Sequence, residues 1–176
     1  YRQYFSTINV IVPSGSYVVA STASASSGYI PYFNAVVSLD VILSNLGVAD
    51  ASNVYASIAT TSPYITILND SAYVGTIAQG GTHNLSGYFQ VQVANMFPNN
   101  TVAQIQVTIH SNNNTNLKVI NLNLLAPHLI FQSSQINANT GNNDGIIDPG
   151  ETFSLTIQNK NDGQGTLYGL KSRLNS

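Results

Sequence analysis

The chain has 176 residues, no cysteine and a formal net charge of −2, and 7% of its residues are charged, against about 25% in an ordinary soluble domain. Apart from Arg2, the first basic residue is Lys118. No cluster of Lys and Arg side chains could therefore neutralise a phosphate backbone or an anionic membrane surface. Nucleic acid is excluded as an expected partner, and no apolar run approaches the roughly 18 residues of a membrane span.

The N-terminal segment is similar to a strand that recurs later in the chain. Residues 7–12, Thr-Ile-Asn-Val-Ile-Val, resemble residues 119–124, which precede the sequence Ala126-Pro127. We therefore expect residues 1–13 to be the closing strand of a preceding module, or a donor strand that completes a module by strand addition.

The central part of the chain has the periodicity of strands. Apolar and polar residues alternate along 89–93 and 101–110, as they do in half-buried strands, and Asn-rich turns separate the segments. No segment has an apolar stripe at helical spacing. We predict an all-β fold in which residues 14–126 form a complete two-sheet sandwich of immunoglobulin-like size. The predicted strands are 17–25, 36–44, 53–60, 64–68, 73–77, 86–94, 101–110 and 117–125.

A repeat divides the chain into tandem modules. The segment from Ser38 to Ile58 recurs 116 residues later, and the copies share Asn45 and Gly47 as Asn161 and Gly163. A period of about a hundred residues fits separately cored domains. We expect residues 127–176 to be the first half of a second immunoglobulin-like module, with about three strands. Either polypeptide beyond residue 176 or strands of another molecule would complete it.

One loop of the second module has the pattern of a calcium site. In residues 140–151, side chains with oxygen fall at positions three, five, nine and twelve of a twelve-residue loop. Ile146 at position seven offers its backbone oxygen, and Gly145 is at the sixth. Calcium accepts carboxylate, amide and backbone oxygens. The alternative is a solvated acidic turn held by side-chain bonds to backbone amides. The predicted calcium ligands are Asn142, Asp144, Ile146, Asp148 and Glu151.

The same residues carry a resemblance to a known family. Residues 143–152, Asn-Asp-Gly-Ile-Ile-Asp-Pro-Gly-Glu-Thr, followed by a strand and by 159–163, resemble the start of bacterial and archaeal extracellular immunoglobulin-like repeats of the cell-adhesion-related (CARDB-like) type. The resemblance covers residues 128–174. It implies a spacer or appended domain of secreted proteases, adhesins or surface-layer proteins. Together with the uncharged polar composition, it implies an extracellular or cell-surface location.

The sequence contains no recognisable catalytic arrangement. His83, His110 and His128 lack the spacing of paired ligands, and no Gly-x-Ser-x-Gly elbow occurs. We predict no catalytic residue and no enzymatic activity.

Two surface features remain open in the sequence. Five of the ten tyrosines lie within the first 32 residues, where they form either a contact surface or the end of a core that lacks tryptophan. Four Asn-x-Ser/Thr triplets, about the number expected by chance, would permit glycans. These candidate glycosylation residues are Asn69, Asn84, Asn99 and Asn113.

Two functions fit this set of predictions. The first is a non-catalytic structural or adhesive repeat of a cell-surface stalk, adhesin or filament, with neighbouring copies of the module or chain as partners, and with strand exchange as one way of completing it. The second is an accessory immunoglobulin-like domain of a secreted protease or other hydrolase.

Overall fold

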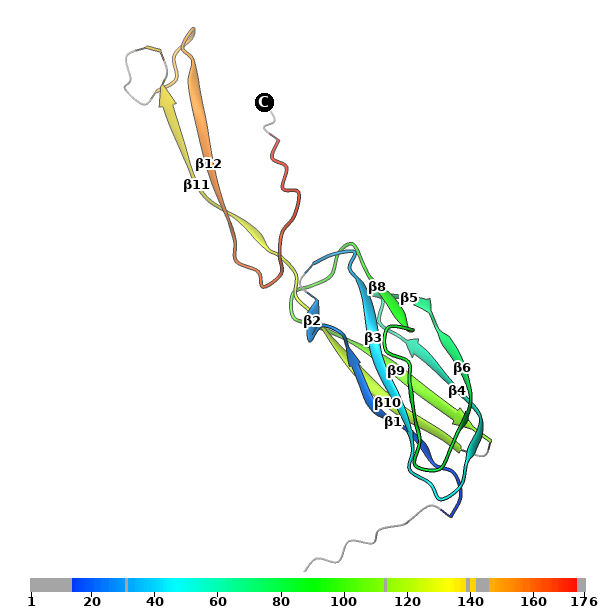
Figure 1. The fold of residues 1–176 in the computed structure, drawn as a ribbon. Helices are drawn as coiled ribbons and strands as arrows, with labels where there is room; N and C mark the ends of the chain where they lie inside the picture. The colour runs from blue at the N-terminus through cyan, green and yellow to red at the C-terminus, as the bar shows by residue number, and fades with distance from the viewer. Residues whose placement is uncertain (1–13, 31, 113, 139, 142–145, 174–176) are drawn as a thin grey trace, which may run out of the picture.

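The computed structural model of the chain describes residues 14–30, 32–112, 114–138, 140–141 and 146–173, and in them every regular element is a strand. The predicted all-β fold is confirmed. A two-sheet sandwich forms the body, and a long two-stranded hairpin extends from one end of it (Figure 1). Within these residues no helix is long and apolar enough to cross a membrane.

The first sheet of the sandwich has the order β1-β3-β8-β5, and β7 also pairs with β3. All of its pairs are antiparallel. Its strands are β1 (Val18–Ala25), β3 (Val36–Asn45), β5 (Ile65–Asn69), β7 (Thr82–Asn84) and β8 (Gln90–Val93).

The second sheet has the order β2-β10-β9-β4-β6. Its pairs are antiparallel except that β2 runs parallel to the end of β10. Its strands are β2 (Tyr29–Ile30), β4 (Ala51–Thr60), β6 (Ser71–Ile77), β9 (Thr101–Ser111) and β10 (Asn114–Leu124).

Alternating apolar residues from both sheets fill the space between them. Leu39, Val41 and Leu43 of β3 are fully buried, and Ile105 and Val107 of β9 belong to the same core cluster. Burying one such side chain stabilises the fold by about 1.5 to 3 kcal/mol. The period-two pattern of the sequence therefore identified the inner face of each long strand.

Asparagine side chains close the seam between the two sheets. The Nδ2 of Asn114 donates to the backbone oxygen of Ser16 at 2.9 Å, and the Nδ2 of Asn116 donates to that of Val18 at 2.6 Å. Both bonds tie β10 to the start of β1. They satisfy backbone groups on an edge strand that would otherwise be open to pairing with another chain.

The largest departure from the predicted strands falls in residues 86–94. Only Gln90–Val93 is a strand there, because the residues before it turn: the Tyr88 amide donates to the Leu85 oxygen at 3.0 Å, and Gly87 has a φ of 78°. The turn lets both Leu85 and Phe89 enter the core. The short strands β2 and β7 were not predicted.

The extended hairpin consists of β11 (Leu129–Ala138) and β12 (Phe153–Asn161). The sequence predicted about three strands in this part of the chain, but residues 162–173 form none. Their counterparts in the repeat lie mostly in β4, which is held between β6 and β9. The described residues of the hairpin region offer no such neighbours, so the backbone of 162–173 has no ladder to join.

Asn45, at the end of β3, is a fully buried polar residue of the sandwich. Its Oδ1 accepts the backbone amides of Tyr17 at 3.0 Å and Gly47 at 3.1 Å. Its Nδ2 donates to the backbone oxygens of Ala49 at 2.8 Å and Ile77 at 3.1 Å, with Ala78 at 3.3 Å. One amide therefore satisfies backbone groups from three segments.

Replacing Asn45 should destabilise the sandwich strongly. Asn45→Ala leaves several buried backbone groups without partners, and we expect the free energy of unfolding to fall by about 2 to 4 kcal/mol. Urea denaturation of the chain followed by circular dichroism measures the loss. The control is Asn121→Ala on the exposed face of β10, which should change stability by less than about 0.5 kcal/mol. Equal effects of the two substitutions would show that the buried amide is dispensable.

Candidate functional site

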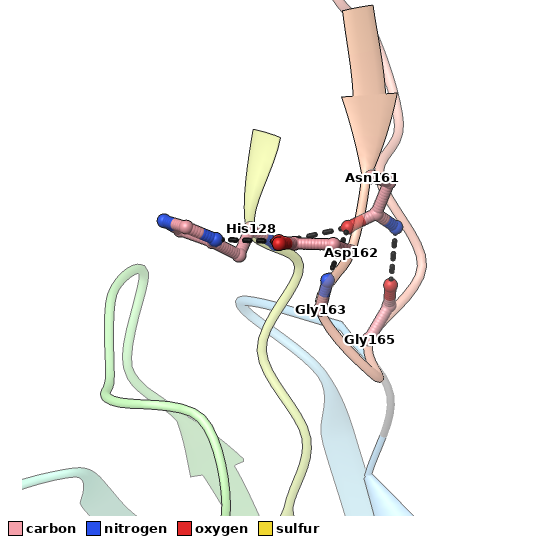
Figure 2. Close-up of polar contacts among 5 residues, drawn as sticks. All are labelled: His128, Asn161, Asp162, Gly163 and Gly165. Atoms are coloured by element: carbon pink, nitrogen blue, oxygen red, sulfur yellow. Dashed lines mark hydrogen bonds and ion pairs between the residues drawn. The ribbon is translucent and has the colours of Figure 1, made fainter. Parts of the chain in front are cut away.

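The link between the sandwich and the hairpin is held by the side chain of Asn161 (Figure 2). Its Oδ1 accepts the backbone amides of His128 at 2.9 Å and Gly163 at 3.2 Å, and its Nδ2 donates to the Gly165 oxygen at 2.9 Å. The Asp162 amide donates to the His128 oxygen at 2.9 Å. We call this arrangement the Asn161 clasp. It holds the end of β12 against the start of β11.

The clasp requires glycine at two positions. A Cβ on Gly163 would overlap the backbone of residues 126–128, and a Cβ on Gly165 would overlap that of residues 125–127. The Gly165 amide donates to the Ala126 oxygen at 3.0 Å, so the two backbones are in direct contact. Neither glycine has a positive φ. Close packing, rather than a left-handed backbone, therefore selects glycine here.

The sandwich contains the same arrangement at the end of β3. There Asn45 stands for Asn161, and Gly47 lies against residues 15–17 as Gly163 lies against 126–128. The Leu46 amide donates to the Tyr17 oxygen at 2.8 Å, as Asp162 does to His128. The sequence singled out the repeated Asn and Gly but not the bonds that they make.

The two hairpins also share their register. β1 pairs with β3 as β11 pairs with β12, and the register shifts between Ala20 and Thr22 in one and between Phe131 and Ser133 in the other. The first strands correspond at an offset of 111 residues and the second strands at 116. The hairpin loop of the second copy is therefore five residues longer, and the acidic residues lie within that longer loop.

A surface hydrogen bond between His128 and Asp162 lies beside the clasp. The Nδ1 of His128 is 2.5 Å from the Oδ1 of Asp162, with 66% and 40% of the two side chains exposed (Figure 2). Water screens a pair of this exposure, so it contributes little to stability. His83 and His110 lie elsewhere, in β7 and β9. In the described residues no three His, Cys, Asp or Glu side chains come together as they would around a metal ion.

Further contacts join the link to the sandwich. The Oδ1 of Asn99 accepts the Ala126 amide at 3.0 Å, and the rings of Tyr32 and Tyr168 meet edge to face with centroids 6.0 Å apart. Tyr29 is 56% exposed and Tyr32 is 40% exposed. These two tyrosines therefore lie on the surface near the link, whereas Tyr17 is half-buried; Tyr1 and Tyr4 lie outside the described residues.

The predicted calcium loop is described only in part, since Asn142 and Asp144 lie outside the described residues. The Glu151 amide donates to the Asp148 oxygen at 3.1 Å, and the Asp148 amide donates to the Glu151 Oε2 at 3.2 Å. Gly150, with a φ of 91°, lies between them. Residues 148–151 thus form a tight turn that a carboxylate closes.

The base of the loop is also closed by hydrogen bonds. The Oγ1 of Thr140 accepts the Thr152 amide at 3.0 Å and lies 3.1 Å from the Thr152 hydroxyl. A Cβ on Gly141, whose φ is 109°, would overlap the Glu151 carboxylate. Ile146 is exposed. The described donor set, the Asp148 and Glu151 carboxylates, is of the oxygen type that calcium accepts.

The candidate glycosylation residues differ in their surroundings. Asn84 and Asn99 are exposed, and each uses its Oδ1 to accept a backbone amide. The Nδ2 of Asn69, the atom a glycan would occupy, donates to the Tyr88 oxygen at 2.8 Å. Asn113 lies outside the described residues. The geometry therefore favours Asn84 and Asn99 over Asn69 as carriers of a glycan.

Comparison with known proteins adds little to this description. No family model matches the chain, and no curated protein matches it. Among solved structures, the native conformation of alpha-2-macroglobulin from E. coli is similar with a TM-score of 0.48 and 14% identity. That similarity covers 69% of this chain and 8% of the other. A similarity of this size carries no information about what this chain binds or does.

Removing the Asn161 amide should loosen the link without unfolding the sandwich. In Asn161→Ala, the backbone amides of His128 and Gly163 lose their acceptor, and we expect their hydrogen exchange to speed up about ten-fold. Asn161→Asp keeps the acceptor oxygens and should preserve much of the protection. Nuclear magnetic resonance of the exchanging amides measures both. Unchanged exchange at His128 in Asn161→Ala would mean that the clasp does not hold the link.

Proposed function

We propose that the chain is a non-catalytic, extracellular, structural and adhesive segment of tandem immunoglobulin-like modules, as in a cell-surface stalk, adhesin or filament. Residues 14–126 would be one complete module, and residues 127–176 would begin a second. The observation that carries this proposal is the repeated hairpin, which preserves the bulge, the asparagine and the glycine packing at both places. A link fixed by hydrogen bonds gives successive modules a defined connection.

The strand order supports an immunoglobulin-like module. In such domains three neighbouring antiparallel strands form one sheet. The sheet that faces it contains the first two strands of the domain. Here β4, β9 and β10 form the first group, and β1, β3 and β8 lie opposite. Cysteine and tryptophan, which pin the core of antibody domains, are absent from the sequence. The buried Asn45 and the aliphatic core would take over that stabilising part.

The hairpin β11–β12 supports the view that further strands complete the second module. Val18 and Val41 in the first module are 1% and 0% exposed, whereas Leu129 and Ile157 at the corresponding positions are 40% and 43% exposed. In the first module β9 and β10 cover this face. A face of that kind favours association. We propose that a neighbouring copy or further polypeptide covers it, and that residues 1–13 are the segment suited to strand exchange.

Assembly should depend on the side chains on one face of the N-terminal segment. In an extended donor strand, Val10 would face the acceptor core and Asn9 would face away. Val10→Asp places a charge in that core and should abolish concentration-dependent assembly, whereas Asn9→Asp adds the same charge and should leave it intact. Size-exclusion chromatography and electron microscopy of the two variants and of a chain without residues 1–12 decide the matter.

Assembly that survives both Val10→Asp and the deletion would exclude residues 1–13 as the donor. A chain that stays monomeric in every form would instead favour the accessory domain of a secreted hydrolase.

We further propose that calcium binds the loop of the second module through Asn142, Asp144, Asp148, Glu151 and the Ile146 oxygen. The Asp148 and Glu151 carboxylates lie on one tight turn and carry like charges, which a cation would compensate. Calcium would supply that charge and would stiffen the loop between β11 and β12. Modules outside cells bind calcium weakly, with Kd values of about 0.1 to 1 mM.

Calorimetric titration of the chain with calcium should reveal one site in this range. Asp148→Ala keeps the backbone bonds of the turn but removes one carboxylate, and it should abolish the binding heat. The matched control is Asp70→Ala, which removes an exposed aspartate from a turn of the sandwich and should leave the heat unchanged. If the unmodified chain gives no heat at millimolar calcium, the loop is only a hydrogen-bonded turn.

A further inference from the structure

A row of aromatic side chains crosses the outer face of the second sheet. Tyr55 of β4 lies directly opposite Tyr73 of β6 on one side and opposite His110 of β9 on the other. The Tyr55 and His110 rings stack with centroids 4.4 Å apart and planes inclined by 15°. Tyr73 is 75% exposed and Tyr55 is 42% exposed. The row is therefore open to a ligand.

A shallow pocket of about 280 Å³ adjoins this row. Besides the two stacked rings, its lining includes the amide side chains of Asn53, Asn112 and Asn114 and the hydroxyl of Thr115. Among the described residues that line it, none is Asp, Glu, Lys or Arg. An aromatic surface bordered only by amides and hydroxyls suits a ligand that has apolar faces and many hydroxyl groups but no charge.

Hydrogen bonds hold these polar side chains in place before any ligand arrives. The Nδ2 of Asn53 donates to the Oδ1 of Asn112 at 3.0 Å, and the Nδ2 of Asn112 donates to the Ser52 hydroxyl at 2.5 Å. The His110 Nδ1 lies 3.1 Å from the Thr115 hydroxyl. An amide has two donor hydrogens and two acceptor lone pairs. Each asparagine therefore keeps capacity for a ligand while its rotamer is fixed.

The backbone at Asn53 departs from regular strand geometry. Asn53 has a φ of 51°, in the left-handed region, and lies where the register of β4 against β6 shifts between Ala51 and Val54. A bulge turns a side chain away from the regular alternation of the strand and is common near binding sites. Here it accompanies the bond between Asn53 and Asn112, which joins β4 to the turn between β9 and β10.

We propose that this surface, defined by Tyr73, Tyr55, His110, Asn53 and Asn112, binds a neutral saccharide. The C–H face of a pyranose ring would stack on the tyrosines, whose ring faces carry partial negative charge. The sugar hydroxyls would bond to the asparagine amides. This proposal names a ligand class for the adhesive role and therefore rests on the proposed function. The turn between β9 and β10 lies at the end of the sandwich away from the hairpin β11–β12 (Figure 1), so bound sugar would leave the link clear.

The test is a titration of the isotope-labelled chain with mannotriose and cellotriose, with trigalacturonic acid as the charged comparison. Backbone amide signals are followed by nuclear magnetic resonance. We expect at least one neutral trisaccharide to shift the signals of Tyr55, His110, Asn112 and Thr115 with a Kd on the order of 1 mM. The charged sugar should bind at least about five-fold more weakly, because no Lys or Arg among the described lining residues meets its carboxylates.

Asn53→Gly tests the amide without disturbing the fold, since glycine adopts a positive φ freely. It should weaken binding about five-fold or more. The control is Asn34→Gly, the same substitution at another exposed asparagine with a positive φ of 57°, which should not change the Kd. Tyr73→Ala removes a highly exposed ring and should also weaken binding.

Three results would overturn the proposal: no shift with either neutral sugar at 20-fold the expected Kd, shifts confined to other residues, or an unchanged Kd in both Asn53→Gly and Tyr73→Ala. The assembly experiment on Val10→Asp does not involve this surface. A failure of saccharide binding is therefore distinguishable from a failure of the tandem-array function.

Discussion

Hydrogen-bond partners for the backbone at the start of each hairpin are the requirement on which this structure depends. Two segments of the chain meet there, and some of their amides and oxygens lie beyond the last pair of the strand ladder. Asn45 meets the need from a fully buried position, accepting two amides and donating to backbone oxygens. Aspartate lacks the donor and serine lacks the reach. A primary amide is the side chain that offers both functions on a short stem.

Asparagine side chains form hydrogen bonds to the backbone elsewhere in the molecule too, in places where most proteins use charged groups. Asn114 and Asn116 close the seam between the sheets, and Asn99 caps the amide of Ala126. In the described part of the chain every buried side-chain nitrogen or oxygen has a partner. The side-chain contact of His128 with Asp162 lies on the surface. Neutral hydrogen bonds are screened less by salt than surface ion pairs are.

The long strands could be predicted from the sequence because burial on one face imposes a period of two. The alternation in residues 101–110 placed Ile105 and Val107 in the core correctly. The turn before β8 was missed because Leu85 and Phe89 are apolar and resemble a continuing strand, while Gly87 alone marks the reversal. The strand β2 has two residues and exists through its pairing with the end of β10. No local pattern encodes such a contact.

The candidate sites show a similar limit. The repeated asparagine and glycine identified the clasp positions, since two copies of a pair at one offset are visible in the sequence, but the accepting and donating backbone groups depend on the fold. The row of Tyr73, Tyr55 and His110 was invisible, because it requires the register of three strands that are far apart in the chain. Of these residues, the sequence analysis considered His110 alone, as one of three histidines that lack the spacing of paired ligands.

The two copies of the hairpin separate what local bonds determine from what burial determines. β11–β12 has the register, the bulge and the clasp of β1–β3, although Leu129 and Ile157 are exposed where Val18 and Val41 are buried. Its shape therefore comes from the ladder and the Asn161 clasp. Burial of Leu129 and Ile157 contributes little to its stability, because both are exposed. A two-stranded hairpin in water is marginally stable at best. The amide clasp holds the hairpin at the end of the sandwich, while the apolar face of the hairpin is exposed. A hairpin arranged in this way takes its shape from local hydrogen bonds alone, without burial of its apolar face.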